Sequence, residues 1–324
     1  MDVHAEAGPP DRRAGGLGQR AVDGDGRAVG KRTGHPPIVA PGADVTPAAS
    51  TTGVRLLRCA PMTAESAPEL IRTATARGVT TLTLDSPGNR NALSRALMTQ
   101  LLDALAEAAD DDAVRTVVLA HTGPVFCSGA DLAETAAAYA GTAEMPAAML
   151  GDLLGAVWDF PKPTVARVGG AARAGGLGLI AATDIAVVAE DATFAFSEVR
   201  LGVVPAIISA PVLRRVAPRP AAELLLTGEV FDGLRAAEIG LATRAVPAAE
   251  VDEAVAEYTD ALTCGGPIAL GATKQLLRRP AGPTVRAELD DLTALSVAYF
   301  GSDEGREGVT AFKEKRPPAW TPED

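Results

Sequence analysis

Histidine and cysteine are scarce in this chain of 324 residues. It holds three histidines, of which only His121 follows residue 61. Its three cysteines, Cys59, Cys127 and Cys264, lie far apart in the sequence. These counts exclude a zinc site built from several Cys and His ligands and give no basis for a disulfide framework. We therefore predict a protein of the reducing cytoplasm that binds no metal.

Long apolar runs and an excess of positive charge are also lacking. No segment reaches the roughly 18 apolar residues that a bilayer-spanning helix needs, and the first residues, MDVHAEAGPPDRR, lack the apolar part of a secretory signal. The chain has 41 acidic and 30 basic residues, which gives a formal net charge of −11. Because nucleic acids and anionic membranes attract Lys and Arg, we expect neither as a partner.

Aromatic residues make up 4% of the chain, whereas hydrophobic residues of all kinds make up 47%, so we expect a core of Ala, Leu and Val. Residues 1–61 hold 10 Gly and 7 Pro and no Phe, Trp or Tyr. Such a segment cannot bury enough apolar surface to offset its chain entropy. We interpret it as a disordered tail or an over-extended start, since patterned sequence begins at Met62.

The hydrophobic pattern after Met62 alternates between strands and helices. Ser94 is expected to cap a helix whose apolar positions recur with a period of 3.6 residues. Strands are predicted at 80–84, 116–120, 165–168 and 193–196, and helices around 149–157 and at 206–216, 251–262, 267–278, 284–300 and 303–314. This order predicts an α/β layer architecture with a helical C-terminal extension.

Two loops place small residues where a strand passes into a helix, CSGAD at 127–131 and AGGLG at 174–178. The first N–H groups of a helix are unpaired and carry partial positive charge. Two such loops facing each other offer two donors to one oxygen, as in a site that stabilises an oxyanion or enolate. GLGLIA at 176–181 also matches a dinucleotide-binding pattern, but no strand directly precedes it, and no Lys-Ser or Lys-Thr follows to make a phosphate-binding loop.

Six segments follow one another in the order of a known family. They are TLTLDSPGNRNALS (81–94), VFCSGADL (125–132), FPKPTVARVGG (160–170), AGGLGLIAATDIAVVAEDATFAFSEVRLGVVP (174–205), LLLTGEVFDGLRAAEIGLATRAVP (224–247) and EGREGVTAFKEKRP (304–317). Together they resemble the crotonase superfamily of enoyl-CoA hydratases and isomerases. The resemblance implies an α/β spiral of strand-strand-helix turns at 62–260, a C-terminal helical trimerisation region at 261–324, and a homotrimer or homohexamer.

The resemblance also implies where the chemistry lies. The backbone N–H groups of Ala130 and Gly175 match the family's oxyanion hole for the thioester carbonyl of an acyl-CoA. Family hydratases use two glutamates, of which the second matches Glu198 and the first falls on Gly178 and is missing. Substrate contacts are expected from Gly129, Gly176, Gly178 and Asp131, with Phe312 and Lys315 matching a CoA contact made across a subunit interface. Coenzyme A belongs to the substrate, so no separate cofactor is expected.

Several other residues are expected to have structural roles and not catalytic ones. His121, Asp184 and Cys127 are expected to be structural, the last because no base lies near it in the sequence. The lysines that family members carry near the first loop are replaced by Pro124 and Ala133. Arg90 or Arg173 is the expected substitute toward the nucleotide phosphates.

Three functions stay open at this point. The text around Gly178 and Glu198 resembles hydratases of branched acyl-CoAs such as methylglutaconyl-CoA, which favours a 2-enoyl-CoA hydratase. A single carboxylate favours a Δ3/Δ2-enoyl-CoA isomerase with Glu198 as the sole proton shuttle. The missing glutamate also allows an acyl-CoA binding protein without catalysis. We prefer the hydratase.

Overall fold

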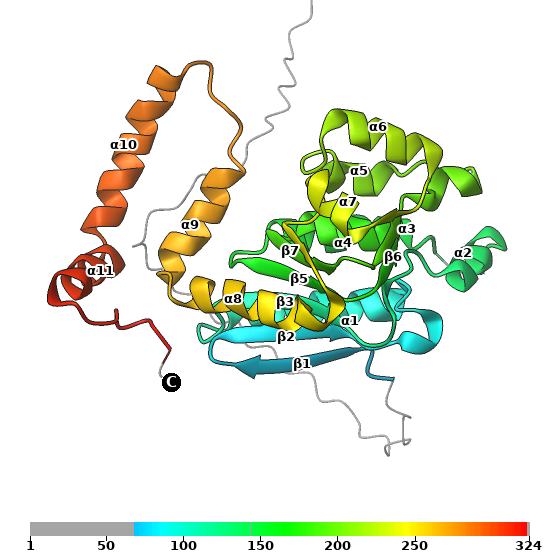
Figure 1. The fold of residues 1–324 in the computed structure, drawn as a ribbon, viewed down its shortest axis with the longest axis horizontal. Helices are drawn as coiled ribbons and strands as arrows, with labels where there is room; N and C mark the ends of the chain where they lie inside the picture. Colours follow the sequence, from blue (N-terminus) through cyan, green and yellow to red (C-terminus); the bar gives the residue numbers. More distant parts are fainter. Residues whose placement is uncertain (1–67, 143, 323–324) are drawn as a thin grey trace, which may run out of the picture. The chain divides into compact units, whose positions relative to one another are not determined.

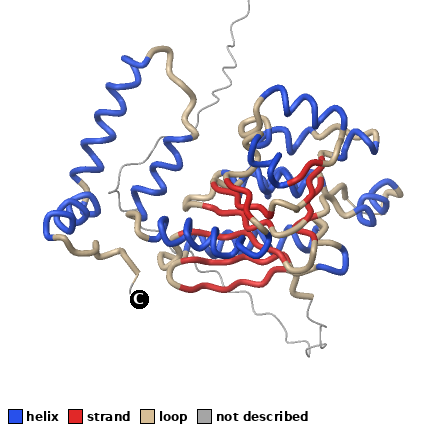
Figure 2. The backbone as a smooth tube through the Cα atoms, viewed as in Figure 1, coloured by secondary structure: helices blue, strands red, loops and turns tan. Residues whose placement is uncertain are grey.

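The computed structural model describes residues 68–142 and 144–322, so the expectations for residues 1–61 lie outside the described residues. The strands form two sheets (Figures 1 and 2). The larger sheet has the order β1 (Ile71–Ala76), β2 (Val79–Leu84), β3 (Thr116–His121), β5 (Thr164–Val168), β7 (Ile185–Ala189) and β10 (Arg244–Val246). The smaller has the order β4 (Val125–Cys127), β6 (Ala171–Arg173), β8 (Thr193–Ala195) and β9 (Phe231–Asp232).

The chain alternates between the two sheets. Strands β3, β5 and β7 join the larger sheet, and each is followed at once by a strand of the smaller sheet, β4, β6 and β8. Helices α2 (Leu132–Tyr139) and α3 (Ala147–Trp158) follow the first pair, α4 (Gly175–Ala182) follows the second, and α5 (Ala206–Val212) and α6 (Pro218–Thr227) follow the third. The predicted spiral of strand-strand-helix turns is thereby confirmed.

The core lies on both faces of the larger sheet. All six residues of β3 are buried, as a parallel strand covered on both sides requires. Helix α1 (Arg95–Asp110) packs on β1 and β2, whereas α8 (Val251–Thr263) packs on β3, β5 and β7. Most core side chains are Leu, Val and Ala, as expected, but three fully buried rings, Phe126, Phe194 and Phe196, belong to the smaller sheet or follow it directly.

The long helices agree closely with the sequence pattern. Ser94 caps α1, because its hydroxyl accepts a hydrogen bond from the N–H of Leu97 at 3.2 Å. The C-terminal helices are α9 (Pro267–Leu277), α10 (Val285–Gly301) and α11 (Asp303–Glu314), each within two residues of its predicted bounds. Among the described residues, no helix is both long enough and apolar enough to cross a membrane.

Several short elements were not predicted. Strands β4 and β6 lead directly into the two glycine-containing loops, and each has three residues, too few to show a period. Strand β1 and the elements α6, β9, α7 (Gly233–Glu238) and β10 also escaped prediction. Helix α5 ends at Val212, four residues before the predicted end at 216.

The C-terminal helices carry exposed apolar side chains. Val297 and Phe300 on α10 are 68% and 69% exposed, and Phe312 on α11 is 86% exposed. Such side chains are what a subunit interface would cover. The homotrimer or homohexamer stays a prediction.

Candidate active site

A cavity of about 750 Å³ lies where the two sequence-predicted loops meet. Ala130 of the first loop and Ala174 of the second both line it, together with Glu198 from the short 3₁₀-helix η2 (Ser197–Leu201). Three segments that are far apart in the sequence therefore line the same cavity. This is the grouping that the sequence predicts for the reacting end of a substrate.

The two loops touch through Gly129. Its φ of +87° suits glycine, and a Cβ atom placed there would lie 3.0 Å from the Cβ of Ala174 and 3.3 Å from the backbone nitrogen of Gly175. Any side chain at residue 129 would therefore push the loops apart. The glycine brings the backbone of the first loop against the start of helix α4.

Both predicted donors keep their N–H groups unpaired. Leu93 and Ala130 form a parallel bridge, but its hydrogen bond runs from the N–H of Leu93 to the carbonyl of Gly129 at 2.8 Å, so the bridge does not use the N–H of Ala130. Gly175 is the first residue of α4 and has no intrahelical acceptor. Within the described part of the chain, neither N–H has another acceptor. Ala130 lines the cavity, whereas Gly175 directly follows the lining residue Ala174 and does not line the cavity itself.

Ala174 has an unusual backbone conformation at this point. Its φ is +46° and its ψ is −114°, a conformation that side-chain-bearing residues rarely adopt. Its carbonyl nevertheless accepts hydrogen bonds from the N–H groups of Leu177 and Gly178, at 2.9 and 3.3 Å. The strained residue thus turns the chain directly from β6 into α4. All eight residues of α4 are buried, and the packing holds the turn in place.

Glu198 is half-buried, and its Oε2 atom is shielded from solvent yet has no hydrogen-bond partner among the described residues. Burial raises the pKa of this carboxyl above its ordinary value. A buried acceptor without a partner is costly in a folded protein, so this atom is a candidate for contact with a ligand. Because Glu198 also lines the cavity, its carboxyl is a candidate general acid or base.

The position of the missing glutamate is filled by apolar side chains. A Cβ atom at Gly178 would lie 2.8 Å from Cγ2 of Ile208 and 3.0 Å from Cδ1 of Leu154. Gly178 does not line the cavity, and neither does Gly176, which packs on the backbone of Cys127. We predicted that these two glycines contact the substrate, but the structure places neither of them at the cavity. Both instead allow α4 to pack closely against its neighbours.

Asp131 lines the cavity but is committed to its own loop. It caps α2 by accepting hydrogen bonds from the N–H groups of Ala133 and Glu134, at 2.9 and 3.1 Å. Arg173 also lines the cavity, yet its guanidinium donates to the carbonyl and the hydroxyl of Thr193. This commitment argues against Arg173 as a phosphate ligand. Arg90, exposed at the cavity, keeps that predicted role open.

Phe312 and Lys315 do not line the cavity. Phe312 lies on α11 with its ring exposed, and Lys315 ends that helix in the left-handed conformation, with a φ of +57°. A contact with coenzyme A across a subunit interface stays a prediction for both residues.

The apolar side of the cavity was not predicted from the sequence. It comes from α2 and from the stretch that leads into α3, with Leu132, Ala136, Tyr139, Met145, Pro146, Ala147 and Leu150. No helix was predicted over α2, and none of its residues is buried. An exposed helix rich in alanine has no apolar stripe that would identify it. Its contribution depends on where the fold places it.

His121 and Cys127 were expected to be structural, and their contacts within the protein agree with that role. The Nε2 atom of His121 accepts a hydrogen bond from the N–H of Gly169 at 3.0 Å, and burial lowers the pKa of this imidazole. Cys127 is fully buried, which raises the pKa of its thiol to about 12 and keeps it protonated. Neither residue lines the cavity.

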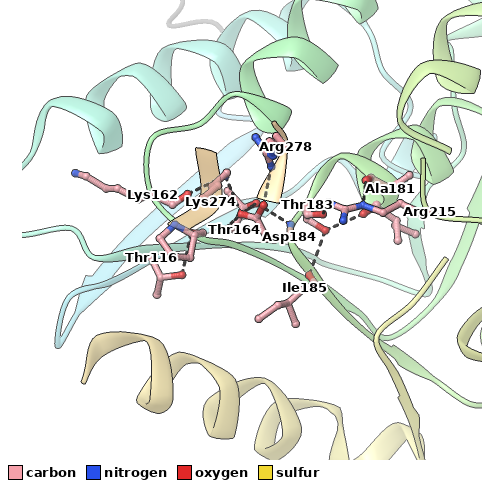
Figure 3. Close-up of polar contacts among 12 residues, drawn as sticks. Thr116, Lys162, Thr164, Ala181, Thr183, Asp184, Ile185, Arg215, Lys274 and Arg278 are labelled. Carbon is pink, nitrogen blue, oxygen red and sulfur yellow. Dashed lines mark hydrogen bonds and ion pairs between the residues drawn. The ribbon is translucent and has the colours of Figure 1, made fainter. Parts of the chain in front are cut away.

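Asp184 does more than end a turn. Its carboxylate lies 2.7 Å from Nζ of Lys274 and 2.6 Å from Nη2 of Arg278, both on or next to α9, and it accepts two hydrogen bonds from Thr164 (Figure 3). Arg278 also stacks on the ring of Trp158, with its Cζ 4.6 Å from the ring centroid. Asp184 follows α4 by two residues, so this cluster ties the C-terminal helices to the element that carries Gly175.

Comparison with known proteins places this geometry in a family. The sequence model of the enoyl-CoA hydratase/isomerase family matches residues 74–323. A protein of Thermus thermophilus described as a putative enoyl-CoA hydratase is 37% identical over 242 residues, covering 72% of this chain and 94% of its own length. The 2,3-dehydroadipyl-CoA hydratase of Escherichia coli is 32% identical over 242 residues, covering 73% of this chain and 92% of its own length.

Solved structures agree with the sequence comparison. A putative enoyl-CoA hydratase/isomerase (crotonase) from Legionella pneumophila is 36% identical, with a TM-score of 0.72 over 78% of this chain and 98% of its own. Pseudomonas aeruginosa AtuE is 35% identical, with a TM-score of 0.73 over 78% of this chain and 100% of its own.

Proposed function

The chain belongs to the enoyl-CoA hydratase/isomerase family, and from this premise we propose that it adds water across the double bond of a 2-enoyl-CoA thioester. The single observation that carries this proposal is the carboxyl of Glu198, which lines the cavity and whose buried Oε2 atom has no partner in the part of the chain that the structure describes. The two free N–H groups of Ala130 and Gly175 support it, because they suit an anionic oxygen.

In the proposed reaction the thioester carbonyl oxygen accepts hydrogen bonds from the N–H groups of Ala130 and Gly175. Water forms a bond from its oxygen to the β-carbon of the acyl chain and gives one proton to the carboxylate of Glu198. The electron pair of the double bond moves toward the thioester oxygen, where the two donors stabilise the enolate. Glu198 then returns the proton to the α-carbon, which leaves a 3-hydroxyacyl-CoA and the free carboxylate.

A Δ3/Δ2-enoyl-CoA isomerase is the second candidate, and the surroundings of Gly178 favour it. Ile208 and Leu154 occupy the space in front of Gly178, so no carboxyl group takes the place of the missing glutamate there. Glu198 alone could take a proton from the α-carbon and return it to the γ-carbon across the same enolate. This reaction needs the oxyanion donors and one carboxyl, but no water.

Product analysis distinguishes these functions. Purified protein is incubated separately with trans-2-enoyl-CoA and 3-enoyl-CoA. The products are separated and their molecular masses are measured by mass spectrometry. A product heavier than the 2-enoyl substrate by one water supports the hydratase. An isomer from the 3-enoyl substrate, without hydration of either, would replace it with the isomerase. Thioester binding without turnover would show a binding protein and overturn both enzymatic proposals.

A further inference from the structure

A hydratase that lacks one of two glutamates must hold its water in another way, and this inference rests on the proposed hydration. At Gly178, where one family glutamate is missing, the side chains of Ile208 and Leu154 occupy the space in which a carboxylate side chain would begin. Glu198 can take the proton of the water. A second polar group is needed to orient the water oxygen toward the β-carbon.

Four of the polar side chains that line the cavity already have partners. The hydroxyl of Thr135 donates to the carbonyl of Asp131 at 2.8 Å, and Asp131 itself caps α2. Asn89 accepts from the hydroxyl of Ser86 at 2.9 Å and donates to Asp131 at 3.4 Å. Arg173 is held by Thr193. These side chains are engaged in supporting the loops around the site.

Ser197 differs from them in two ways. Within the described residues its hydroxyl has no hydrogen-bond partner, and it is half-buried at the wall of the same cavity as Glu198. It also directly precedes Glu198 in η2, so their Cα atoms are about 3.8 Å apart. The other hydroxyls without a partner lie on different elements, with Ser128 in the first oxyanion loop and Tyr139 at the end of α2.

The backbone fixes Ser197 and Glu198 as a unit. The carbonyl of Glu198 accepts a hydrogen bond from the N–H of Val203 at 3.0 Å, and η2 ends at Gly202 in the left-handed conformation, with a φ of +70°. Phe196, directly before Ser197, is fully buried. The two side chains are therefore presented to the cavity from a segment that is anchored at both ends.

We propose that Ser197 is the water-binding residue of this site, its hydroxyl and the carboxylate of Glu198 holding the water that adds to the β-carbon. The water gives one proton to Glu198 while its oxygen bonds to carbon, and the Ser197 hydroxyl keeps its own proton throughout. Ser197 thus orients the water and takes no part in proton transfer. Abstraction of a proton from the α-carbon, which involves no water, does not depend on it.

Two reactions of the same protein test this division. One is hydration of trans-2-butenoyl-CoA, and the other is exchange of the α-protons of butyryl-CoA with D2O, which needs the oxyanion donors and Glu198 but adds no water. For Ser197→Ala we expect kcat for hydration to fall about 10-fold, the effect of one hydrogen bond lost in the transition state, with KM and the exchange rate within about twofold of the wild type. Ser197→Thr keeps the hydroxyl and should restore hydration at least in part.

Ser209→Ala is the matched control, because its hydroxyl donates to the carbonyl of Ala206 on α5 and does not line the cavity. It should leave both reactions unchanged. If Ser197→Ala hydrates as fast as the wild type, or loses hydration and exchange equally, the role of Ser197 is overturned and the proposed hydratase stands. If the wild type exchanges α-protons but hydrates no 2-enoyl-CoA, the proposed function fails, and the water-binding role fails with it.

Discussion

The Nζ atom of Lys274 lies 2.7 Å from Oδ2 of Asp184, and this ion pair joins helix α9 to the end of helix α4. The lysine side chain is only 6% exposed and the aspartate 22%, so water screens the pair little. Because α4 begins with Gly175, the contact connects the C-terminal helices to the element that holds a proposed oxyanion donor. It gives Asp184 a structural role much larger than that of a turn residue.

Removing the Asp184 carboxylate should strongly destabilise the protein. In Asp184→Ala the charges of Lys274 and Arg278 lose their shared partner inside the protein, which costs about 3–5 kcal/mol of the free energy of unfolding when one member of a buried pair is removed. Urea denaturation of the wild type and the variant measures the loss. Glu257→Ala is the matched control, since its pair with Arg244 is largely exposed and its removal should cost much less than the removal of Asp184. Equal losses in the two variants would contradict a buried cluster.

Lys274 should make stability depend on pH in the alkaline range. Burial lowers the pKa of Lys274 from 10.5 to about 8 in the folded protein. Between these two values the unfolded chain binds more protons than the folded one, so the contribution of this group to the free energy of unfolding rises with pH, by about 1 kcal/mol per unit. Below pH 8 the lysine is charged in both states, and its contribution no longer varies.

The measurement compares wild type and Lys274→Met in urea at pH 7, 8.5 and 9.5. Other groups, such as the buried thiol of Cys127, also change protonation at high pH, but they are common to both proteins. The difference between the two free energies of unfolding isolates Lys274, and it should grow in favour of the wild type from pH 8 upward. A difference that stays constant with pH would show that Lys274 is charged in the folded protein throughout.

Glu198→Gln should lower kcat for hydration by at least about 10²-fold, the lower end for loss of a positioned acid or base. Thioester affinity, measured by calorimetry with a saturated acyl-CoA, should stay nearly the same because the proposed oxyanion donors are backbone groups. Since burial raises the pKa of Glu198, kcat/KM for hydration in the wild type should fall on the acid side at a pH above 4.5, where the carboxylate that accepts the proton of water is lost. An acid limb at the ordinary pKa of a glutamate would contradict the buried carboxyl, and unchanged turnover in the variant would remove Glu198 from the mechanism.

Restoring the missing carboxylate at residue 178 should require two changes. Gly178→Glu alone is expected to destabilise the protein by about 1–3 kcal/mol, because its Cβ would lie 2.8 Å from Ile208. Gly178→Glu combined with Ile208→Ala removes that contact and should recover part of the stability, with a higher hydration rate than Ile208→Ala alone. Thermal unfolding and the hydration assay are measured on all three variants. A single Gly178→Glu variant that is as stable as the wild type would contradict the filled space at this position.

The sequence by itself determined the fold class, the order of the long elements and two of the three pieces of the site. Long helices such as α1 and α8 repeat their apolar residues often enough for the period to stand out, and Ser94 marks its helix start through a local hydrogen bond. The two glycine-containing loops were visible because small residues at a strand-to-helix passage are a local feature. Glu198 was identified because it matches a glutamate of the family that the sequence resembles, in register with both loops.

Only the tertiary structure decided what surrounds those residues. That Ile208 and Leu154 fill the space before Gly178, that Arg173 is held by Thr193, and that Ser197 faces the cavity beside Glu198 all depend on contacts between distant segments. The same holds for Asp184, whose partners on and next to α9 follow it by 90 and 94 residues. Local patterns record the period of an element and the chemistry of its ends. They carry no information on which side chains of other elements pack against it, because long-range packing is settled only when the whole core closes.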